Sequence, residues 1–87
     1  MNHTDESVAE LLTLTREVDD WGTIRYRNTA GQLHRIHGPA MTLPDGSEIW
    51  FQTSRLHRVG GPAETWPDGT QRWWLHGQPV DPDDPSV

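Results

Sequence analysis

Between residues 22 and 80, apolar and polar side chains alternate in short runs that turn-forming residues separate. Residues 47–52 and 70–75 are rich in β-branched and aromatic types. A period of two predicts strands that turn one face toward a core. Two further runs, 33–36 and 56–59, are predicted strands that stop before Gly-Pro, because proline cannot donate to a ladder. The sequence therefore predicts a mainly β protein.

The predicted strands are joined by two kinds of turn. Residues 44–46 and 67–69 both read Pro-Asp-Gly. In this tripeptide the proline ring fixes φ near its turn value, the aspartate side chain hydrogen-bonds to the nearby backbone, and glycine adopts the left-handed conformation. We therefore expect positive φ angles at Gly46 and Gly69. Shorter turns are predicted at the opposite ends of the hairpins, at residues 28–31, 53–54 and 76–77.

The chain repeats itself at a constant spacing. Three blocks recur with an offset of 23 residues: 33–40 recurs as 56–63, 44–47 as 67–70, and 50–51 as 73–74. A more divergent copy, 22–27, aligns with 46–51 at an offset of 24. A constant offset predicts tandem copies of one unit, and divergent terminal copies are typical of such arrays. We predict an antiparallel β-meander of about three tandem hairpin repeats across residues 20–80.

The alternation also assigns side chains to the two faces of the predicted sheet. Three aromatic residues fall at equivalent positions on one face, Tyr26, Trp50 and Trp73, and three apolar residues fall on the other, Ile49, Phe51 and Trp74. Both faces are thus partly apolar, and a single layer cannot cover both by itself. A further segment or a second chain must cover one of them.

The two ends of the chain differ from the repeats. Residues 1–19 are predicted to form a capping segment, with a short helix at about 5–12 followed by a strand near 14–18. The alternative is a strand over residues 12–18, where apolar and polar residues also alternate. Residues 81–87 are acidic, contain two prolines and lack core residues, so we expect a disordered or extended tail.

Composition narrows the functional classes. The chain has 87 residues, five tryptophans and no cysteine, which excludes disulfides and thiolate metal sites. No apolar run reaches the length of a membrane span and no secretory signal is present, so a cytoplasmic location is expected. The net charge of −6 belongs to the ends, because residues 1–20 carry −5 and 81–87 carry −3, whereas 21–80 carry +2. This distribution disfavours nucleic-acid and membrane binding.

The repeat resembles a known family. Its motif is Asp-Gly-x-x-x-Trp-aromatic, a short turn, and then Leu-His-Arg-x-x-Gly-Pro-Ala, carried best by residues 44–46, Trp50, 56–58 and 61–63. This pattern is similar to the variant MORN (membrane occupation and recognition nexus) repeats of bacteria and phages. The resemblance implies an elongated meander of hairpins that contacts other proteins. Some bacterial members of the family are antitoxins or immunity partners.

The recurring polar residues are expected to be structural. Histidines at 34, 37, 57 and 76 invite a metal or catalytic interpretation, but the second copy has Gly60 where the first has His37. We expect His34 and His57 to lie half-buried beside the next hairpin, bonded to a carbonyl or a turn aspartate. Arg35 and Arg58 are expected to bond a carboxylate or a turn carbonyl. No motif for a metal, a cofactor or catalysis is present, so we predict that the protein is not an enzyme.

The function that the sequence favours is binding to another protein. Exposed aromatic and arginine side chains are enriched at binding hot spots. The predicted partner-binding residues are Phe51, Trp74, Arg25, Arg27 and Arg72. The predicted structural residues of the repeat are Gly46, Gly69, Trp50, Trp73, His34, His57, Arg35, Arg58, Pro39 and Pro62.

Two settings fit a small module of this kind: a phage-encoded inhibitor of a host or defence protein, which would act in the host cytoplasm, and an immunity or antitoxin protein that neutralises a toxin. The alternative function is nucleic-acid or small-ligand binding through an Arg/aromatic face. We also predict a homodimer, because the face with Phe51 and Trp74 is apolar and needs a cover.

Overall fold

The computed structural model describes residues 10–83, and these form antiparallel β structure. Ten short strands are present in this part of the chain: β1 (Thr15–Val18), β2 (Ile24–Arg27), β3 (Met41–Thr42), β4 (Glu48–Ile49), β5 (Phe51–Gln52), β6 (Arg55–Leu56), β7 (Glu64–Thr65), β8 (Gln71–Arg72), β9 (Trp74–Leu75) and β10 (Gln78–Pro79). The mainly β class and the antiparallel, hairpin-like pairing that the alternation predicts are confirmed.

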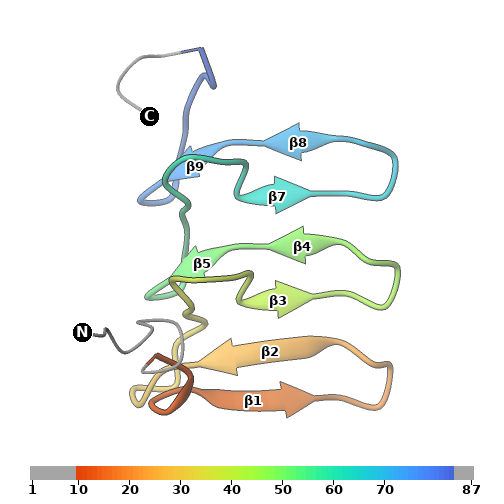
Figure 1. The fold of residues 1–87 in the computed structure, drawn as a ribbon, viewed down its shortest axis with the longest axis vertical. Helices are drawn as coiled ribbons and strands as arrows, with labels where there is room; N and C mark the ends of the chain where they lie inside the picture. Colours follow the sequence, from red (N-terminus) through yellow and green to blue (C-terminus); the bar gives the residue numbers. More distant parts are fainter. Residues whose placement is uncertain (1–9, 84–87) are drawn as a thin grey trace, which may run out of the picture.

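The strands form one larger sheet and two small hairpins. The order in the six-stranded sheet is β1-β2-β3-β4-β7-β8, and β5-β6 and β9-β10 form separate two-stranded pairs. In Figure 1 the hairpins β1–β2, β3–β4 and β7–β8 are stacked like rungs, and β5 and β9 lie together on one side of this stack. Strand β1 and strand β8 are the two edges of the six-stranded sheet.

Each predicted strand with two aromatic residues is interrupted at the first of them. The predictions over residues 47–52 and 70–75 as single strands are therefore wrong in detail. The Trp50 N–H donates to the Ala63 carbonyl in one direction, while the Trp50 carbonyl accepts from the His57 N–H in the other. One residue thus links two ladders that run in different directions, and the backbone leaves the larger sheet there.

The predicted strand over residues 33–36 is also wrong. Only an isolated bridge between Arg27 and Leu33 forms there. The N–H groups of Ile36 and His37 donate instead to the Glu10 carboxylate, at 2.6 and 3.0 Å. A side chain satisfies these donors, so they take no part in a ladder.

The Pro-Asp-Gly turns are confirmed. Gly46 has φ 93° and Gly69 has φ 91°, both in the left-handed region. In the first turn the Gly46 N–H donates to Leu43, and the Asp45 carboxylate accepts from both the N–H and the hydroxyl of Ser47. The Ser47 hydroxyl, with the backbone N–H groups, lowers the pKa of Asp45 below its usual range.

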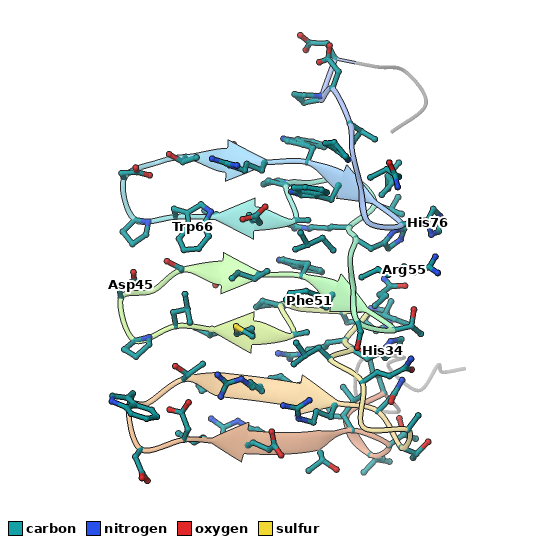
Figure 2. All side chains as sticks on the ribbon, turned by 180° about the vertical axis from the view of Figure 1, so that it is seen from behind. His34, Asp45, Phe51, Arg55, Trp66 and His76 are labelled. Atoms are coloured by element: carbon teal, nitrogen blue, oxygen red, sulfur yellow. The ribbon has the colours of Figure 1, made fainter. Side chains whose placement is uncertain are left out.

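The shorter turns at the opposite ends of the hairpins are confirmed as well. Thr53 and Ser54, between β5 and β6, have φ of 48° and 65°. His76 and Gly77, between β9 and β10, have φ of 51° and 79°. Two consecutive positive φ angles match the right-handed twist of flanking strands. Figure 2 shows Asp45 and Trp66 at one end of the hairpins and His34, Arg55 and His76 at the other.

The ends of the chain are described in part. The strand predicted near residues 14–18 is confirmed as β1. The predicted helix at 5–12 falls mostly outside the described residues. Within them, residues 10–11 are helical and residues 12–13 form a turn, in which the Thr13 N–H donates to the Glu10 carbonyl. Of the tail, residues 84–87 lie outside the described part. No helix in residues 10–83 has the length and apolar character needed to cross a membrane.

The interior of this fold is small. Among the described residues, the buried apolar side chains are Ala40 and Ala63, both with no exposed surface. The large aromatic residues at the equivalent positions 26, 50 and 73 are half-buried. The array is therefore held together mainly by contacts between neighbouring hairpins, since no thick hydrophobic core forms within residues 10–83.

Candidate partner-binding surface

Arginine side chains lie over aromatic rings along the array. The Arg35 Cζ lies 4.2 Å from the ring centroid of Tyr26, and the Arg58 Cζ lies 3.9 Å from that of Trp50. These distances allow a cation–π interaction, which contributes roughly 0.5–2 kcal/mol depending on desolvation. The arginine of one motif therefore packs on the aromatic residue that precedes it in the chain.

The Gly-Pro that follows each arginine completes this arrangement. The Nη1 of Arg35 donates to the Pro39 carbonyl at 3.4 Å, and that of Arg58 donates to Pro62 at 3.1 Å. A Cβ at the glycine before this proline, Gly61, would lie only 2.7 Å from the Arg58 Cζ, and the same distance holds at Gly38. Glycine stands there because the guanidinium passes directly over the backbone.

The motif histidines join one hairpin to the next, as expected, but through a different partner. The Nδ1 of His34 accepts from the Thr53 N–H at 3.0 Å, and the Nδ1 of His57 accepts from the His76 N–H at 2.9 Å. The expected carbonyl or aspartate partners are not used, because the next turn presents an N–H. An accepting Nδ1 requires the unprotonated ring nitrogen.

His57 is held in the neutral form. The side chain is buried, and this desolvation lowers its pKa below the usual 6.5, with a further contribution from nearby His76. The two imidazole centroids are 4.4 Å apart. This histidine is therefore a structural acceptor between β6 and the turn after β9.

The predicted partner-binding residues fall into two columns of the array. Cross-strand pairing aligns Arg25, Ile49 and Arg72 through residues 41 and 64, which lie between them in the sheet. The second column consists of residues at equivalent repeat positions: Arg27, Phe51 and Trp74. Cross-strand pairs thus place Arg25 and Arg72 in a first row, whereas the second row, Arg27, Phe51 and Trp74, is defined by repeat position alone.

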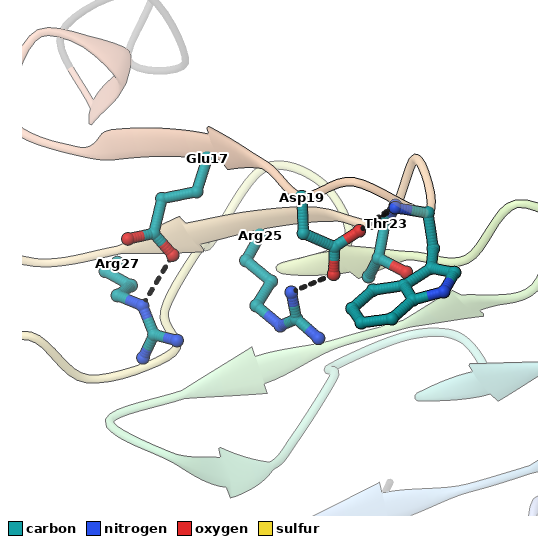
Figure 3. A network of polar contacts seen from close by, with 6 residues as sticks. Glu17, Asp19, Thr23, Arg25 and Arg27 are labelled. Carbon is teal, nitrogen blue, oxygen red and sulfur yellow. Dashed lines mark hydrogen bonds and ion pairs between the residues drawn. The ribbon is translucent and has the colours of Figure 1, made fainter.

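Two of the three arginines in these rows have carboxylate partners (Figure 3). The Nη1 of Arg25 lies 2.8 Å from an Asp19 oxygen, and the Nε of Arg27 lies 2.8 Å from a Glu17 oxygen. The Arg25 guanidinium is the main cause of a lowered pKa at Asp19. Arg72 is exposed and pairs with no carboxylate in residues 10–83.

One carboxylate binds both the Trp74 indole of the second row and the indole of Trp66. The Trp74 Nε1 donates to Glu64 at 2.6 Å, and the Trp66 Nε1 donates to the other Glu64 oxygen at 3.2 Å. Phe51 and Trp74 are each half-buried. Glu64 therefore orients two tryptophans while leaving part of each on the surface.

Sequence reasoning missed several exposed apolar side chains. Trp21 is 80% exposed at the tip of the β1–β2 turn, and Val59 and Ile36 are 74% and 48% exposed. Ile36 and Val59 are 23 positions apart, so they occupy the same place in successive copies. Two features of the sequence could have revealed these exposed side chains. Trp21 stands at a turn position that holds aspartate in the other copies, and Ile36 and Val59 directly precede His37-Gly38 and Gly60-Gly61.

Two open hollows lie on the surface of residues 10–83. An open hollow of about 590 Å³ at the β8 edge is lined by Gln71, Arg72, Trp73, Trp74, Pro79 and Val80. A second, of about 440 Å³, lies near the N-terminal end and includes Glu10 and His34. Within the described residues, no three histidine, aspartate or glutamate side chains are grouped so that they could hold a metal ion.

Comparison with known proteins adds no relative. No protein-family model, no curated protein and no solved structure matches this chain.

Proposed function

We propose that this protein is a small, non-catalytic interaction module that binds a partner protein and inhibits or masks it. The observation that carries this proposal is the set of half-buried arginine and aromatic side chains at equivalent repeat positions, Arg27, Phe51 and Trp74, on an antiparallel array. Residues of these types provide most of the binding energy in many interfaces. The absence of a large buried core within residues 10–83 leaves these side chains available for contacts outside the chain.

The array is best explained as about three tandem hairpin copies of the variant MORN kind. Support comes from contacts that recur at the sequence offset, such as the bonds from Arg35 and Arg58 to the carbonyls of Pro39 and Pro62. The acidic residues after 80 are proposed to form a tail outside the array. In such repeat arrays each copy contacts its neighbours, and the extended surface serves as the binding face.

The setting we favour is a phage-encoded inhibitor of a host or defence protein, with an immunity or antitoxin protein as the alternative. Both act by covering a partner's surface. Nucleic-acid binding is the weaker alternative, because Asp19 and Glu17 already neutralise two arginines of the candidate face. Neighbouring genes that encode phage structural proteins or a toxin would distinguish the two settings.

The test is affinity capture from a host lysate with three forms of the chain: wild type, Phe51→Asp with Trp74→Asp, and a control with Ile36→Asp and Val59→Asp. The control places the same two charges on another apolar column. We expect wild type and the control to retain one partner, identified by mass spectrometry, and the Phe51/Trp74 variant to lose it while circular dichroism shows an intact fold.

Two results would contradict the proposal. Capture of no partner by the wild type argues against a binding module. Unfolding of the Phe51/Trp74 variant shows that these side chains belong to the interior, so the assigned binding face is wrong.

A further inference from the structure

An internal contact occurs twice in the array and has no counterpart at its C-terminal end. Arg35 lies over Tyr26 and Arg58 lies over Trp50. The next aromatic residue in this series is Trp73, and no guanidinium of residues 10–83 lies over its ring.

The backbone register identifies the residue that replaces the third arginine. The N–H groups of His34, His57 and Val80 donate to the carbonyls of the aromatic residues at 26, 50 and 73, at 3.0, 3.1 and 3.0 Å. Val80 thus stands where the motif histidine stands in the other copies. The following position, which is Arg35 or Arg58 in the other copies, is Asp81.

A backbone donor at the same edge also lacks its counterpart. The N–H groups of Tyr26 and Trp50 donate to the carbonyls of Ala40 and Ala63, at 2.8 and 2.7 Å. The equivalent Trp73 N–H has no acceptor among residues 10–83, because β8 is the last strand of the sheet. The 590 Å³ hollow lies at this edge and includes Trp73 in its lining.

We propose that the β8 edge binds an extended segment of a partner protein that presents an arginine side chain. The partner's guanidinium covers the Trp73 ring, and a carbonyl of its backbone accepts from the Trp73 N–H. The segment thereby reproduces what residues 58–63 supply to Trp50. This inference rests on the proposed function and names the chemistry of the partner.

The local charge favours a cation over an anion. Asp81 and Asp83 are exposed in the segment that follows β10. Among residues 10–83, Arg72 is the one cationic residue that lines the hollow. An arginine suits this place better than a lysine, because its planar guanidinium stacks on an aromatic face while it donates hydrogen bonds at its edge. An exposed sheet edge gives the segment its main-chain bonds.

The test uses a capped peptide with the sequence of residues 58–65. This segment contains the arginine that lies over the Trp50 ring and the alanine whose carbonyl accepts from the Trp50 N–H. Nuclear magnetic resonance titration of the full chain should shift the Trp73 backbone N–H and indole signals saturably. A peptide with Arg58→Gln should bind about fivefold more weakly, which corresponds to the loss of one exposed cation–π contact.

Asp81→Arg should abolish peptide binding and raise the melting temperature, because it supplies the guanidinium internally. Asp83→Arg, which adds the same charge outside the register, should still bind.

Three results of the peptide experiment would overturn the inference: equal binding of the arginine and glutamine peptides, peptide binding that survives Asp81→Arg, and binding that appears only after deletion of residues 84–87. The last result would show that the chain's own tail occupies the edge. A lysate partner captured equally by wild type and Asp81→Arg also overturns it while leaving the proposed function intact. Peptide binding without any captured partner supports the site and argues against the proposed function.

Discussion

At the scale of single residues, the arginine of the repeat motif has three structural roles. Arg58 covers the Trp50 ring, donates to the Pro62 carbonyl and occupies the space that a side chain at Gly61 would need. The Trp50 Nε1 is buried and has no hydrogen-bond partner among the described residues. Burying an unpaired donor costs free energy. The contact between the guanidinium and the ring is a favourable interaction at the same site and offsets part of that cost.

Gly61→Ala should therefore destabilise the fold by displacing Arg58. The new Cβ would lie 2.7 Å from the guanidinium carbon, so the guanidinium must shift from its place over the Trp50 ring. We expect a loss of about 1–2 kcal/mol in the free energy of unfolding, measured by urea denaturation. In an Arg58→Gln background the same substitution should cost much less, because the clashing group is gone. An equal cost in both backgrounds would show that Arg58 is not the reason for the glycine.

Protonation of His57 should weaken the fold at acidic pH. Burial holds its folded pKa below 6.5, so the unfolded chain takes up the proton first as the pH falls. The contribution to stability is complete above about pH 6.5 and decreases as the pH drops from there toward the folded pKa. Melting temperatures between pH 5 and 8 should show this slope in the wild type and a flatter profile in His57→Gln. Identical profiles for the two proteins would exclude His57 as the titrating group.

At the scale of the elements, the turns could be predicted from the sequence and the strand boundaries could not. Pro-Asp-Gly specifies its backbone through local contacts alone, and Gly46 has the positive φ that the sequence predicts. The break at Trp50 depends on two distant partners, the Ala63 carbonyl and the His57 N–H, and no local signal encodes it. Likewise, the loop at Ile36 is determined by Glu10, which lies 26 positions earlier in the chain.

The candidate surface shows the same division. The repeat offsets of 24 and 23 residues align Arg27, Phe51 and Trp74 in sequence. Their partners were not predictable: Glu64 reaches Trp74 only after β7 has paired with β8. The stacking of Arg58 on Trp50 was missed for this reason too, and the sequence suggested only a carbonyl or carboxylate partner for that arginine.

Valine in place of the turn glycines should destabilise each hairpin. Gly46 and Gly69 have φ near 90°, where a β-branched residue is strained by on the order of 1–3 kcal/mol. We expect Gly46→Val and Gly69→Val each to lower the melting temperature, measured by circular dichroism. Asparagine tolerates the left-handed region better, so Gly46→Asn and Gly69→Asn should cost clearly less. Valine variants as stable as the wild type would contradict this explanation of the turns.

At the scale of the whole molecule, the described array consists of one six-stranded sheet and two small hairpins with almost no enclosed core, whereas domains are normally built from packed layers around a core. Within residues 10–83 the fully enclosed apolar groups are two alanines, while Phe51 and Trp74 stay half-exposed. A chain of 87 residues with so little enclosed apolar surface gains stability if a second layer covers it. Residues 1–9 could supply only part of that cover, because Val8 is their one large aliphatic residue apart from Met1.

We therefore expect a homodimer in which two copies pack through the row that contains Phe51 and Trp74. Two-fold symmetry makes a patch its own complement, so one apolar face is sufficient to form the interface. Light scattering at high micromolar concentration should give twice the 9.9 kDa mass of the chain. Phe51→Asp with Trp74→Asp should give a folded monomer, and Ile36→Asp with Val59→Asp should remain dimeric. A wild-type monomer would refute the dimer. If partner capture still depended on Phe51 and Trp74 in that case, this face would bind the partner and not a second copy. Asp81→Arg changes only the β8 edge, so a dimer that persists in this variant shows that the edge is not the dimer interface.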